Sequence, residues 1–294
     1  MLTLEHLGTL KCAAASGLAL RGGRFHVVAD DCTRLHVYDA ATLAELPGVA
    51  LLPDALPAEA RARKAAKPDL EMLTPLPDGR LLALGSGSTA RRARGVVIPL
   101  PAQADTLSTH DLSPLYADLS AVFAELNLEG ACVTGEVLRL FQRGNGEAAV
   151  NALVDLDLSA VMETLAAGAP WGPELLLRTR RVDLGSLPGG PLGFTDAATL
   201  PDGDVLFTAV AEGGGSTYED GAFGGAALGR LTAAGALRWL APLHGPHKLE
   251  GITLAPRADG GCDVFMVADA DDPAVPAPLL RLRLDAATLT EGPR

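Results

Sequence analysis

Five short segments of the sequence carry a polar side chain at an equivalent position, and in four of them it is a carboxylic acid. The segments are AASGLAL (14–20), PDLEMLTPL (68–76), LNLEGACV (126–133), GFTDAATL (193–200) and HKLEGITL (247–254). The equivalent residues are Ser16, Glu71, Glu129, Asp196 and Glu250. Carboxylates that lie close together either hold protons at raised pKa values or bind cations. The pattern therefore indicates a metal site or acid–base chemistry, provided that the fold gathers these segments.

Each segment is typical of the first strand of a β-hairpin. Glycine-containing turns follow, among them RGGR, PDGR and ADGG, and short hairpins need such residues for their positive φ. A second strand follows each turn, and third and fourth strands are visible with weaker alternation. The unit recurs about every 54 to 67 residues, the length of a propeller blade with decorated loops. We therefore predict an all-β fold, a five-bladed β-propeller that forms a single domain over residues 1–294.

The last repeat lacks a fourth strand of its own, and the beginning of the sequence can supply it. The segment LTLEHLGTL (2–10) precedes the first repeat as ALRWLAPL (236–243) precedes the last one. We expect this N-terminal strand to close the last blade, which removes the open edges of the sheet. Short helices are expected in loops, within residues 57–66, 113–125 and 159–167. A six-bladed propeller, with a degenerate blade between residues 129 and 196, is the alternative.

In a propeller, the innermost strands of all blades begin at one mouth of the central channel, and the second strands return to it. The ends of the second strands therefore form another polar ring. We expect this ring to contain Asp30, Ser86, Arg143, Glu212 and Asp269. The loops beyond it are the expected walls of a ligand pocket. The ligand-binding residues that we predict for this pocket are Ser16, Asp30, Lys67, Ser86, Glu212, Lys248, Asp269 and Asp271.

Several carboxylates around a narrow channel repel one another, and three arrangements would relieve the repulsion. A hard divalent cation, for which we expect Ca²⁺, could be held by Glu71, Glu129, Asp196 and Glu250. Basic residues could instead pair with the acids, namely Lys67, Arg143, His247 and Lys248. The acids could also accept backbone N–H groups of a neighbouring blade and act as structural ties. The residues that we expect to be catalytic, if the site is an active site, are Glu129, Glu250, Arg143 and His247.

The composition narrows the classes of partner. The formal net charge is −12, which argues against nucleic acid and anionic membranes, because both bind basic surfaces. The four cysteines are dispersed without metal-binding spacing. The N-terminus lacks a signal-peptide pattern, and no apolar stretch is long enough to span a bilayer. We expect a cytoplasmic, monomeric protein with a small-molecule ligand. One compact basic cluster, ARRARG (90–95), is either a solvated loop or a means of recruiting an anion.

Short motifs shared by the repeats resemble those of bacterial β-propellers of uncharacterised function. The motifs are Asp69-Leu70-Glu71, Asn127-Leu128-Glu129-Gly130, Lys248-Leu249-Glu250-Gly251 and Ala268-Asp269-Ala270-Asp271-Asp272. In them the chain is similar to SdiA-regulated and phytase-esterase-like propellers and, more distantly, to gluconolactonase-type propellers. The resemblance implies an acidic face that often binds a divalent cation, and some of these relatives hydrolyse phosphoesters or lactones. The gluconolactonase metal set of one Glu, two Asn and one Asp has no full match in this sequence.

Two functions are therefore open. In the first, an acidic mouth binds a divalent cation, and the protein, if it is an enzyme, is a metal-dependent hydrolase of a phosphoester or lactone. In the alternative, a non-catalytic propeller binds a ligand or a protein at the same face, and the ring of acids is architectural. Calcium binding distinguishes the two, because only the first requires it.

Overall fold

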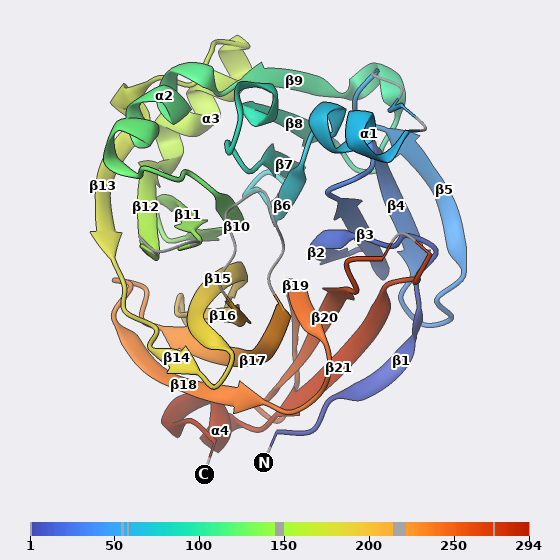
Figure 1. Cartoon of the computed structure of the whole chain (residues 1–294), viewed down its shortest axis with the longest axis vertical. Coiled ribbons are helices and arrows are strands. Elements are labelled where there is room, and N and C mark those ends of the chain that lie inside the picture. The colour runs from blue at the N-terminus through green and yellow to red at the C-terminus, as the bar shows by residue number, and fades with distance from the viewer. Residues whose placement is uncertain are drawn as a thin grey trace.

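The structure, a computed structural model, describes residues 2–53, 56–57, 59–144, 150–213, 222–272 and 274–293. Within these residues the strands form five antiparallel sheets around a central axis (Figure 1). Neighbouring sheets contact each other through their innermost strands, and the last sheet contacts the first. The predicted five-bladed β-propeller is therefore confirmed, and the six-bladed alternative is wrong.

Each of the first three blades follows the chain outward from the channel, with the inner strand first. Blade 1 consists of β2 (Ala15–Arg21), β3 (Arg24–Ala29), β4 (Arg34–Asp39) and β5 (Glu45–Ala50). Blade 2 consists of β6 (Leu70–Pro75), β7 (Leu81–Gly85), β8 (Arg94–Ile98) and β9 (Ser108–Asp111). Blade 3 consists of β10 (Leu128–Thr134), β11 (Val137–Gln142), β12 (Ala152–Asp157) and β13 (Leu176–Arg181).

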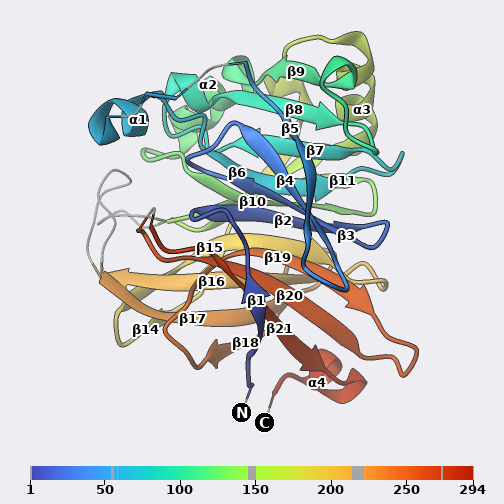
Figure 2. The ribbon, with the colours of Figure 1, turned by 90° about the vertical axis from the view of Figure 1, so that its right-hand side faces the viewer.

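The last two blades depart from this scheme at one edge each. Blade 4 consists of β15 (Gly190–Thr199), β16 (Val205–Gly213), β17 (Ala222–Leu231) and β18 (Leu237–Leu243), with the short β14 (Ser186–Leu187) beside β15. Blade 5 consists of β19 (Lys248–Pro256), β20 (Cys262–Asp269), β21 (Pro278–Leu284) and β1 (Glu5–Thr9). The N-terminal strand β1 pairs with β21, and Arg281 binds Glu5 across the pair at 2.8 Å. The predicted closure of the last blade is confirmed, and both termini lie at one end of the molecule (Figure 2).

Short helices lie in the connections between strands. The α-helices are α1 (Ala60–Ala66), α2 (Ser113–Val122), α3 (Leu158–Ala167) and α4 (Ala286–Glu291). The first three fall where the sequence predicts them, whereas α4 was not predicted. The carbonyl oxygen of Leu289 in α4 accepts hydrogen bonds from Arg230 at 2.6 Å and Trp239 at 3.1 Å, so α4 is fastened to blade 4. None of the helices in the described ranges is long and apolar enough to cross a membrane.

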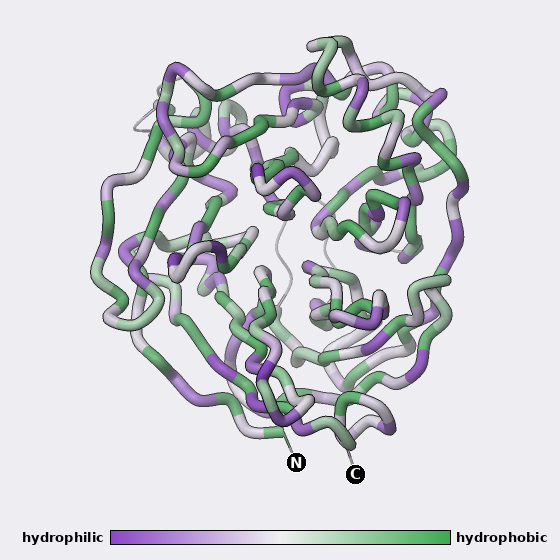
Figure 3. The backbone as a smooth tube through the Cα atoms, turned by 180° about the vertical axis from the view of Figure 1, so that it is seen from behind, coloured by the Kyte–Doolittle hydropathy of each residue, from purple (hydrophilic) through white to green (hydrophobic). Residues whose placement is uncertain are grey.

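The core lies between the faces of neighbouring blades. Inner and second strands such as β6 and β7 are buried along nearly their whole length, because a neighbouring blade covers each face. The outer strand β5 instead alternates between exposed and partly buried residues. Figure 3 shows the resulting mixture of hydrophobic and hydrophilic residues along the chain. Aliphatic side chains fill most of the space between blades. Between blades 3 and 4, Phe141, Phe194 and Phe207 pack edge to face with ring centroids 5.2 and 5.0 Å apart. This packing holds the inner strands, which position the polar residues of the channel.

Candidate functional site

Each inner strand leaves one residue out of its pairing with the second strand. These unpaired residues are Ser16, Glu71, Glu129, Thr195 and Glu250, and all of them are buried. An irregularity of this kind bends the strand and redirects a side chain. Four positions agree with the predicted ring. In blade 4 the equivalent residue is Thr195 rather than Asp196, so the predicted alignment is displaced there by one residue.

The glycine that follows the acid in two of these strands allows neighbouring blades to approach closely. A Cβ atom at Gly251 would lie 2.5 Å from the carbonyl oxygen of Ser16, and one at Gly130 would lie 2.8 Å from the Cα atom of Asp196. Both distances are too short for any side chain. The Glu-Gly pairs therefore combine a redirected acid with close contact between inner strands.

The beginnings of the inner strands and the ends of the second strands together form one polar mouth. We define the mouth by its charged residues, which are Asp30, Lys67, Asp69, Glu71, Arg92, Glu129, Arg143, Glu212, Lys248, Glu250, Asp269 and Asp271. Eight of them are acids and four are bases. The acids of the mouth therefore outnumber the cations available to pair with them.

Blades 1 and 2 contribute an acidic triad, which consists of Asp30, Asp69 and Glu71. One carboxylate oxygen from each lies within 4.8 Å of the others. Lys67 pairs with Asp30 and lies 3.0 Å from Asp69, and Arg92 lies 2.8 Å from the second oxygen of Asp69. Two of the three acids are therefore paired with cations.

Glu71 is the exception in the triad. Its side chain makes no hydrogen bond or ion pair within the described ranges, although the residue is only 9% exposed. Burial raises its pKa well above the ordinary value, and the neighbouring charges of Asp69 and Glu129 raise it further. An unpaired buried carboxyl must either keep a proton or receive a cation.

Blades 3, 4 and 5 contribute a second group of charges around Arg143. Its guanidinium lies 2.7 Å from Glu212 and 3.7 Å from both Glu129 and Glu250. Asn127 donates a further hydrogen bond of 2.5 Å to Glu129. One arginine thus contacts acids from three blades.

Lys248 extends the same network toward the loop after β20. Its ammonium lies 2.8 Å from Asp271, 3.0 Å from Glu212 and 3.7 Å from Glu250. Burial raises the pKa of Glu250 to about 8, although Arg143 and Lys248 oppose the shift. Burial likewise raises the pKa of Glu129 to about 6 and that of Asp269 to about 6. This half of the mouth therefore exchanges protons near neutral pH.

Asp196 does not join either group. The residue is 1% exposed, and one of its oxygens accepts the backbone N–H of Ile252 in the next blade at 2.9 Å. Burial raises its pKa well above the ordinary value. Asp196 therefore acts as a structural tie between blades, which is one of the three arrangements considered in the sequence analysis. In this role it differs from Glu71, Glu129 and Glu250, with which it was predicted to hold a metal.

Three other predicted residues have different surroundings. Ser86 binds the carboxylate of Asp69, and its hydroxyl lies 2.9 Å from that of Ser88. Ser16 donates to the carbonyl oxygen of Ala14 at 3.3 Å. His247 has a lowered pKa, because of burial and the nearby His6 on β1. In the described part of the chain, no hydrogen bond or ion pair joins His247 to the mouth.

Sequence reasoning did not assign two charged residues of the mouth, Asp69 and Arg92, or Asn127, which binds Glu129 of the mouth. Asp69 and Asn127 stand two positions before the acids Glu71 and Glu129, and Lys248 stands two positions before Glu250. A polar residue at this spacing in three of five repeats is a signal that could have been used. Arg92 lies within the basic cluster that was predicted to be solvated or to recruit an anion, whereas its side chain binds Asp69.

Comparison with known proteins places the chain in a family. Residues 11–284 match the sequence pattern of a family of unknown function, DUF6929. The chain belongs to DUF6929. No curated protein matches the sequence. The likeness of this DUF6929 propeller to SdiA-regulated and phytase-esterase-like propellers stays a prediction.

Solved structures share the fold of the DUF6929 chain at low identity. Glutaminyl cyclase from Myxococcus xanthus has a TM-score of 0.53 and 13% identity, with 96% of this chain and 97% of the other covered. A luciferin-regenerating enzyme has a TM-score of 0.51 and 10% identity, with 96% and 95% covered. The mannose phosphorylase MPT-4 from Leishmania mexicana has a TM-score of 0.51 and 12% identity, with 96% and 86% covered. These likenesses show the β-propeller fold alone.

Proposed function

We propose that the mouth of this propeller binds a divalent cation at the acidic triad. The observation that carries the proposal is Glu71, a buried carboxyl without a described partner that faces the carboxylates of Asp30 and Asp69. All three ligands are hard oxygen donors, which suit Ca²⁺ and Mg²⁺ better than softer metals.

The spacing of the triad is compatible with a cation of the size of Ca²⁺. Oxygen ligands of Ca²⁺ lie at about 2.3–2.6 Å, so two ligands on opposite sides of the ion are about 4.6–5.2 Å apart. The corresponding separation for Mg²⁺ is about 4.0–4.2 Å. The triad oxygens lie within 4.8 Å of one another, a limit that both ions satisfy. We prefer Ca²⁺ because it tolerates irregular ligand geometry, whereas Mg²⁺ requires a near-ideal octahedron and gives up its water reluctantly.

Binding of the cation requires two changes at the triad. The ammonium of Lys67 pairs with Asp30 and Asp69, so it must withdraw from at least one of them. Glu71 has a raised pKa, so it must release its proton before its oxygen can coordinate the ion. Both changes weaken binding, and the second makes the affinity increase with pH.

Calorimetric titration with Ca²⁺ and with Mg²⁺ tests the proposal. We expect saturable binding of Ca²⁺, weaker binding of Mg²⁺, and loss of binding in Glu71→Gln. Saturation with Ca²⁺ at about 100 times its Kd should stabilise the fold by about 2.7 kcal/mol, which corresponds to a rise in Tm of about 5 °C. Glu163→Gln, at an exposed position on α3, is the matched control. Equal binding by both variants would contradict the proposal.

We propose as a second step that the mouth hydrolyses a small ester, either a phosphoester or a lactone. The supporting observation is Glu250, a buried acid with a pKa of about 8 beside Arg143 and Lys248. Such a group holds a proton that it can deliver to a leaving oxygen at neutral pH. A bound cation supplies polarisation of the ester and a more acidic water.

The remaining role in this scheme falls to Glu129. Its pKa of about 6 leaves it ionised at neutral pH, so it can accept a proton from water. The assay is the hydrolysis of p-nitrophenyl phosphate and of a δ-lactone by the Ca²⁺-loaded protein. We expect Glu250→Gln to lower the rate about 100-fold, and unchanged Ca²⁺ binding in this variant would separate catalysis from cation binding. Full activity in Glu250→Gln would contradict this assignment.

A further inference from the structure

Lys67 bridges two acids of the triad with its ammonium group. The ammonium pairs with Asp30 and lies 3.0 Å from Oδ1 of Asp69. The side chain is only 16% exposed, and among the described residues its ammonium makes no other hydrogen bond or ion pair. A metal ion bound by the same carboxylates would have to take the place of this ammonium.

The other cation at the triad, Arg92, is bound in a different way. Its guanidinium lies 2.8 Å from Oδ2 of Asp69 and 2.6 Å from the hydroxyl of Ser88, and the residue is buried. The hydroxyl of Ser86 donates to the same Oδ2 atom. Arg92 and Ser86 therefore hold one oxygen of Asp69 and leave the other to Lys67. A metal ion can displace Lys67 without disturbing the contacts of Arg92.

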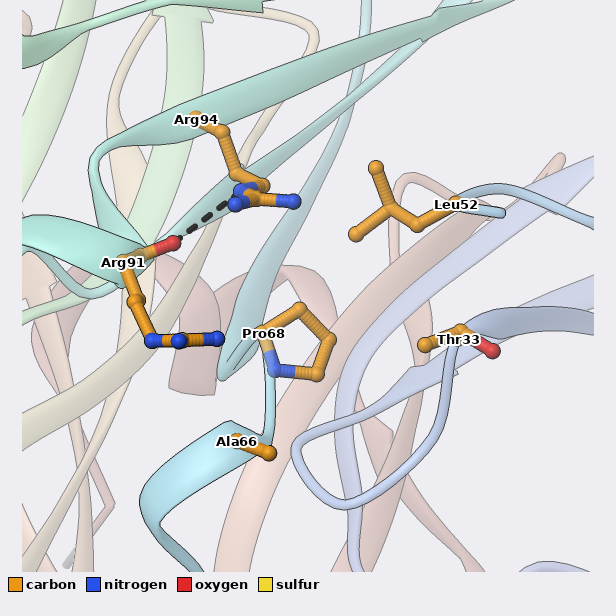
Figure 4. A pocket seen from close by; sticks show the side chains of 6 residues that line it. All are labelled: Thr33, Leu52, Ala66, Pro68, Arg91 and Arg94. Carbon is orange, nitrogen blue, oxygen red and sulfur yellow. Dashed lines mark hydrogen bonds between the residues drawn. The ribbon is translucent and has the colours of Figure 1, made fainter. Parts of the chain in front are cut away.

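The backbone on both sides of Lys67 is held in place. Its N–H donates to the carbonyl oxygen of Arg63 in α1 at 2.8 Å, and the buried Pro68, with its fixed φ, follows it. Ala66 and Pro68 line a small crevice between blades 1 and 2 (Figure 4). Displacement of the ammonium therefore requires only rotation of its flexible four-carbon stem. After displacement it stays tethered close to the triad.

We propose that Lys67 determines which cations the triad accepts, because it is a tethered competitor that divalent ions displace and monovalent ions do not. This inference rests on the proposed cation site. Na⁺ and K⁺ carry the same charge as the ammonium, so they gain no extra attraction to Asp30 and Asp69. The ammonium is already in place, and it competes at an effective concentration far above that of a free ion.

A divalent ion has two advantages over the ammonium. It brings twice the charge to the same carboxylates. It also gains a third ligand in Glu71, whose buried carboxyl pairs neither with Lys67 nor with any other group in the described ranges. If Lys67 competes in this way, a neutral side chain at its position tightens Ca²⁺ binding and lets Na⁺ compete. If Lys67 only supports the fold of the mouth, its loss weakens Ca²⁺ binding or leaves it unchanged.

The test is calorimetric titration of Ca²⁺ into wild type and Lys67→Met at one fixed pH, in tetramethylammonium chloride and then in NaCl of equal ionic strength. Lys67→Met should bind Ca²⁺ at least about tenfold more tightly than wild type, the value of one charge-assisted hydrogen bond. NaCl should weaken Ca²⁺ binding in this variant and not in wild type. Lys67→Arg keeps the charge and should bind no more tightly than wild type. Lys11→Met, which removes an exposed lysine paired with Glu45 at 2.9 Å, is the matched control and should titrate as wild type does.

The possible outcomes separate the role of Lys67 from the cation site itself. If wild type binds Ca²⁺ and Lys67→Met binds it equally or more weakly, or if Na⁺ competes to the same extent in both, the proposal for Lys67 is overturned and the cation site stands. Absence of Ca²⁺ binding in both proteins contradicts both proposals. Binding in Lys67→Met alone, abolished by the added Glu71→Gln, supports competition by Lys67 and contradicts a cation site in wild type. Lys67→Gln, whose amide can still donate to Asp30, replaces Lys67→Met in every comparison if circular dichroism shows that Lys67→Met does not fold.

Discussion

Replacement of Glu250 by glutamine tests whether the mouth holds a proton at neutral pH. The residue is 7% exposed, and burial raises its pKa from 4.5 to about 8 despite the nearby cations Arg143 and Lys248. Glutamine reproduces the size and the neutral charge of the protonated acid. The variant should therefore resemble wild type under acidic conditions and differ from it under basic ones.

The sign and size of the difference follow from the two pKa values of Glu250. Because the pKa is higher in the folded state, the folded protein binds more protons than the unfolded chain, and stability falls as the pH rises through the window from about 4.5 to about 8. One pKa unit corresponds to about 1.4 kcal/mol. Between about pH 5 and pH 8, Glu250 therefore lowers the free energy of unfolding by about 3 to 4 kcal/mol.

Urea unfolding of wild type and Glu250→Gln at about pH 5 and pH 8 measures this contribution. Glu163→Gln serves as the control, since it removes an exposed acid on α3. Between pH 5 and pH 8, the free energy of unfolding of wild type should fall by about 3 to 4 kcal/mol more than that of Glu250→Gln. The control should follow wild type. Parallel pH dependences for wild type and Glu250→Gln would show that the acid is ionised throughout, and the reasoning would be refuted.

Three further predictions concern the cation, the inner strands and the closing strand. The affinity for Ca²⁺ should rise up to about tenfold per pH unit while Glu71 is protonated, because one proton is released on binding; calorimetry at several pH values would contradict this if the affinity were constant. Gly251→Ala should destabilise the protein by about 2 kcal/mol or more, since its Cβ would lie 2.5 Å from the carbonyl oxygen of Ser16. Gly79→Ala, with nothing within 4 Å of the added atom and only a φ of +88° to strain it, should cost about 1 kcal/mol in the same urea titration, and equal costs would argue against close strand contact. Deletion of residues 1–9 should expose the edge of β21 and cause aggregation in size-exclusion chromatography; a stable monomer after deletion would show that β1 is dispensable.

The fold could be predicted from the sequence because its signals are local. Turns such as Pro77-Asp78-Gly79-Arg80 specify hairpins through residues adjacent in the chain, and their recurrence gives the number of blades. The strand that closes the last blade could be predicted because the last repeat lacked a fourth strand and the N-terminal segment had the pattern of one. Helix α4 was missed because its six residues show little periodicity.

The candidate site could be predicted only in part, because it depends on contacts between blades. The ring position of Thr195 depends on where the pairing of β15 with β16 is interrupted, and alternation alone does not specify such an interruption. Asp196 was predicted to be a metal ligand because it is an acid in the repeated motif, but its carboxylate accepts a backbone N–H from another blade. The burial of Arg92 against Asp69 beside the exposed Arg91 could not be predicted from the basic cluster, because it depends on which side chain of the cluster faces the neighbouring acid.

The pairing of β1 with β21 has a consequence for the order in which the protein folds. The ion pair between Glu5 and Arg281 joins positions 276 residues apart. During synthesis β1 emerges from the ribosome early and has no partner strand until residues 278–284 have been made. Closing a loop of this length costs about 5 kcal/mol of chain entropy, which falls sharply once the intervening blades are folded and hold the two strands near each other. We therefore expect ring closure to be the last step of folding, with β1 unpaired until the fifth blade assembles.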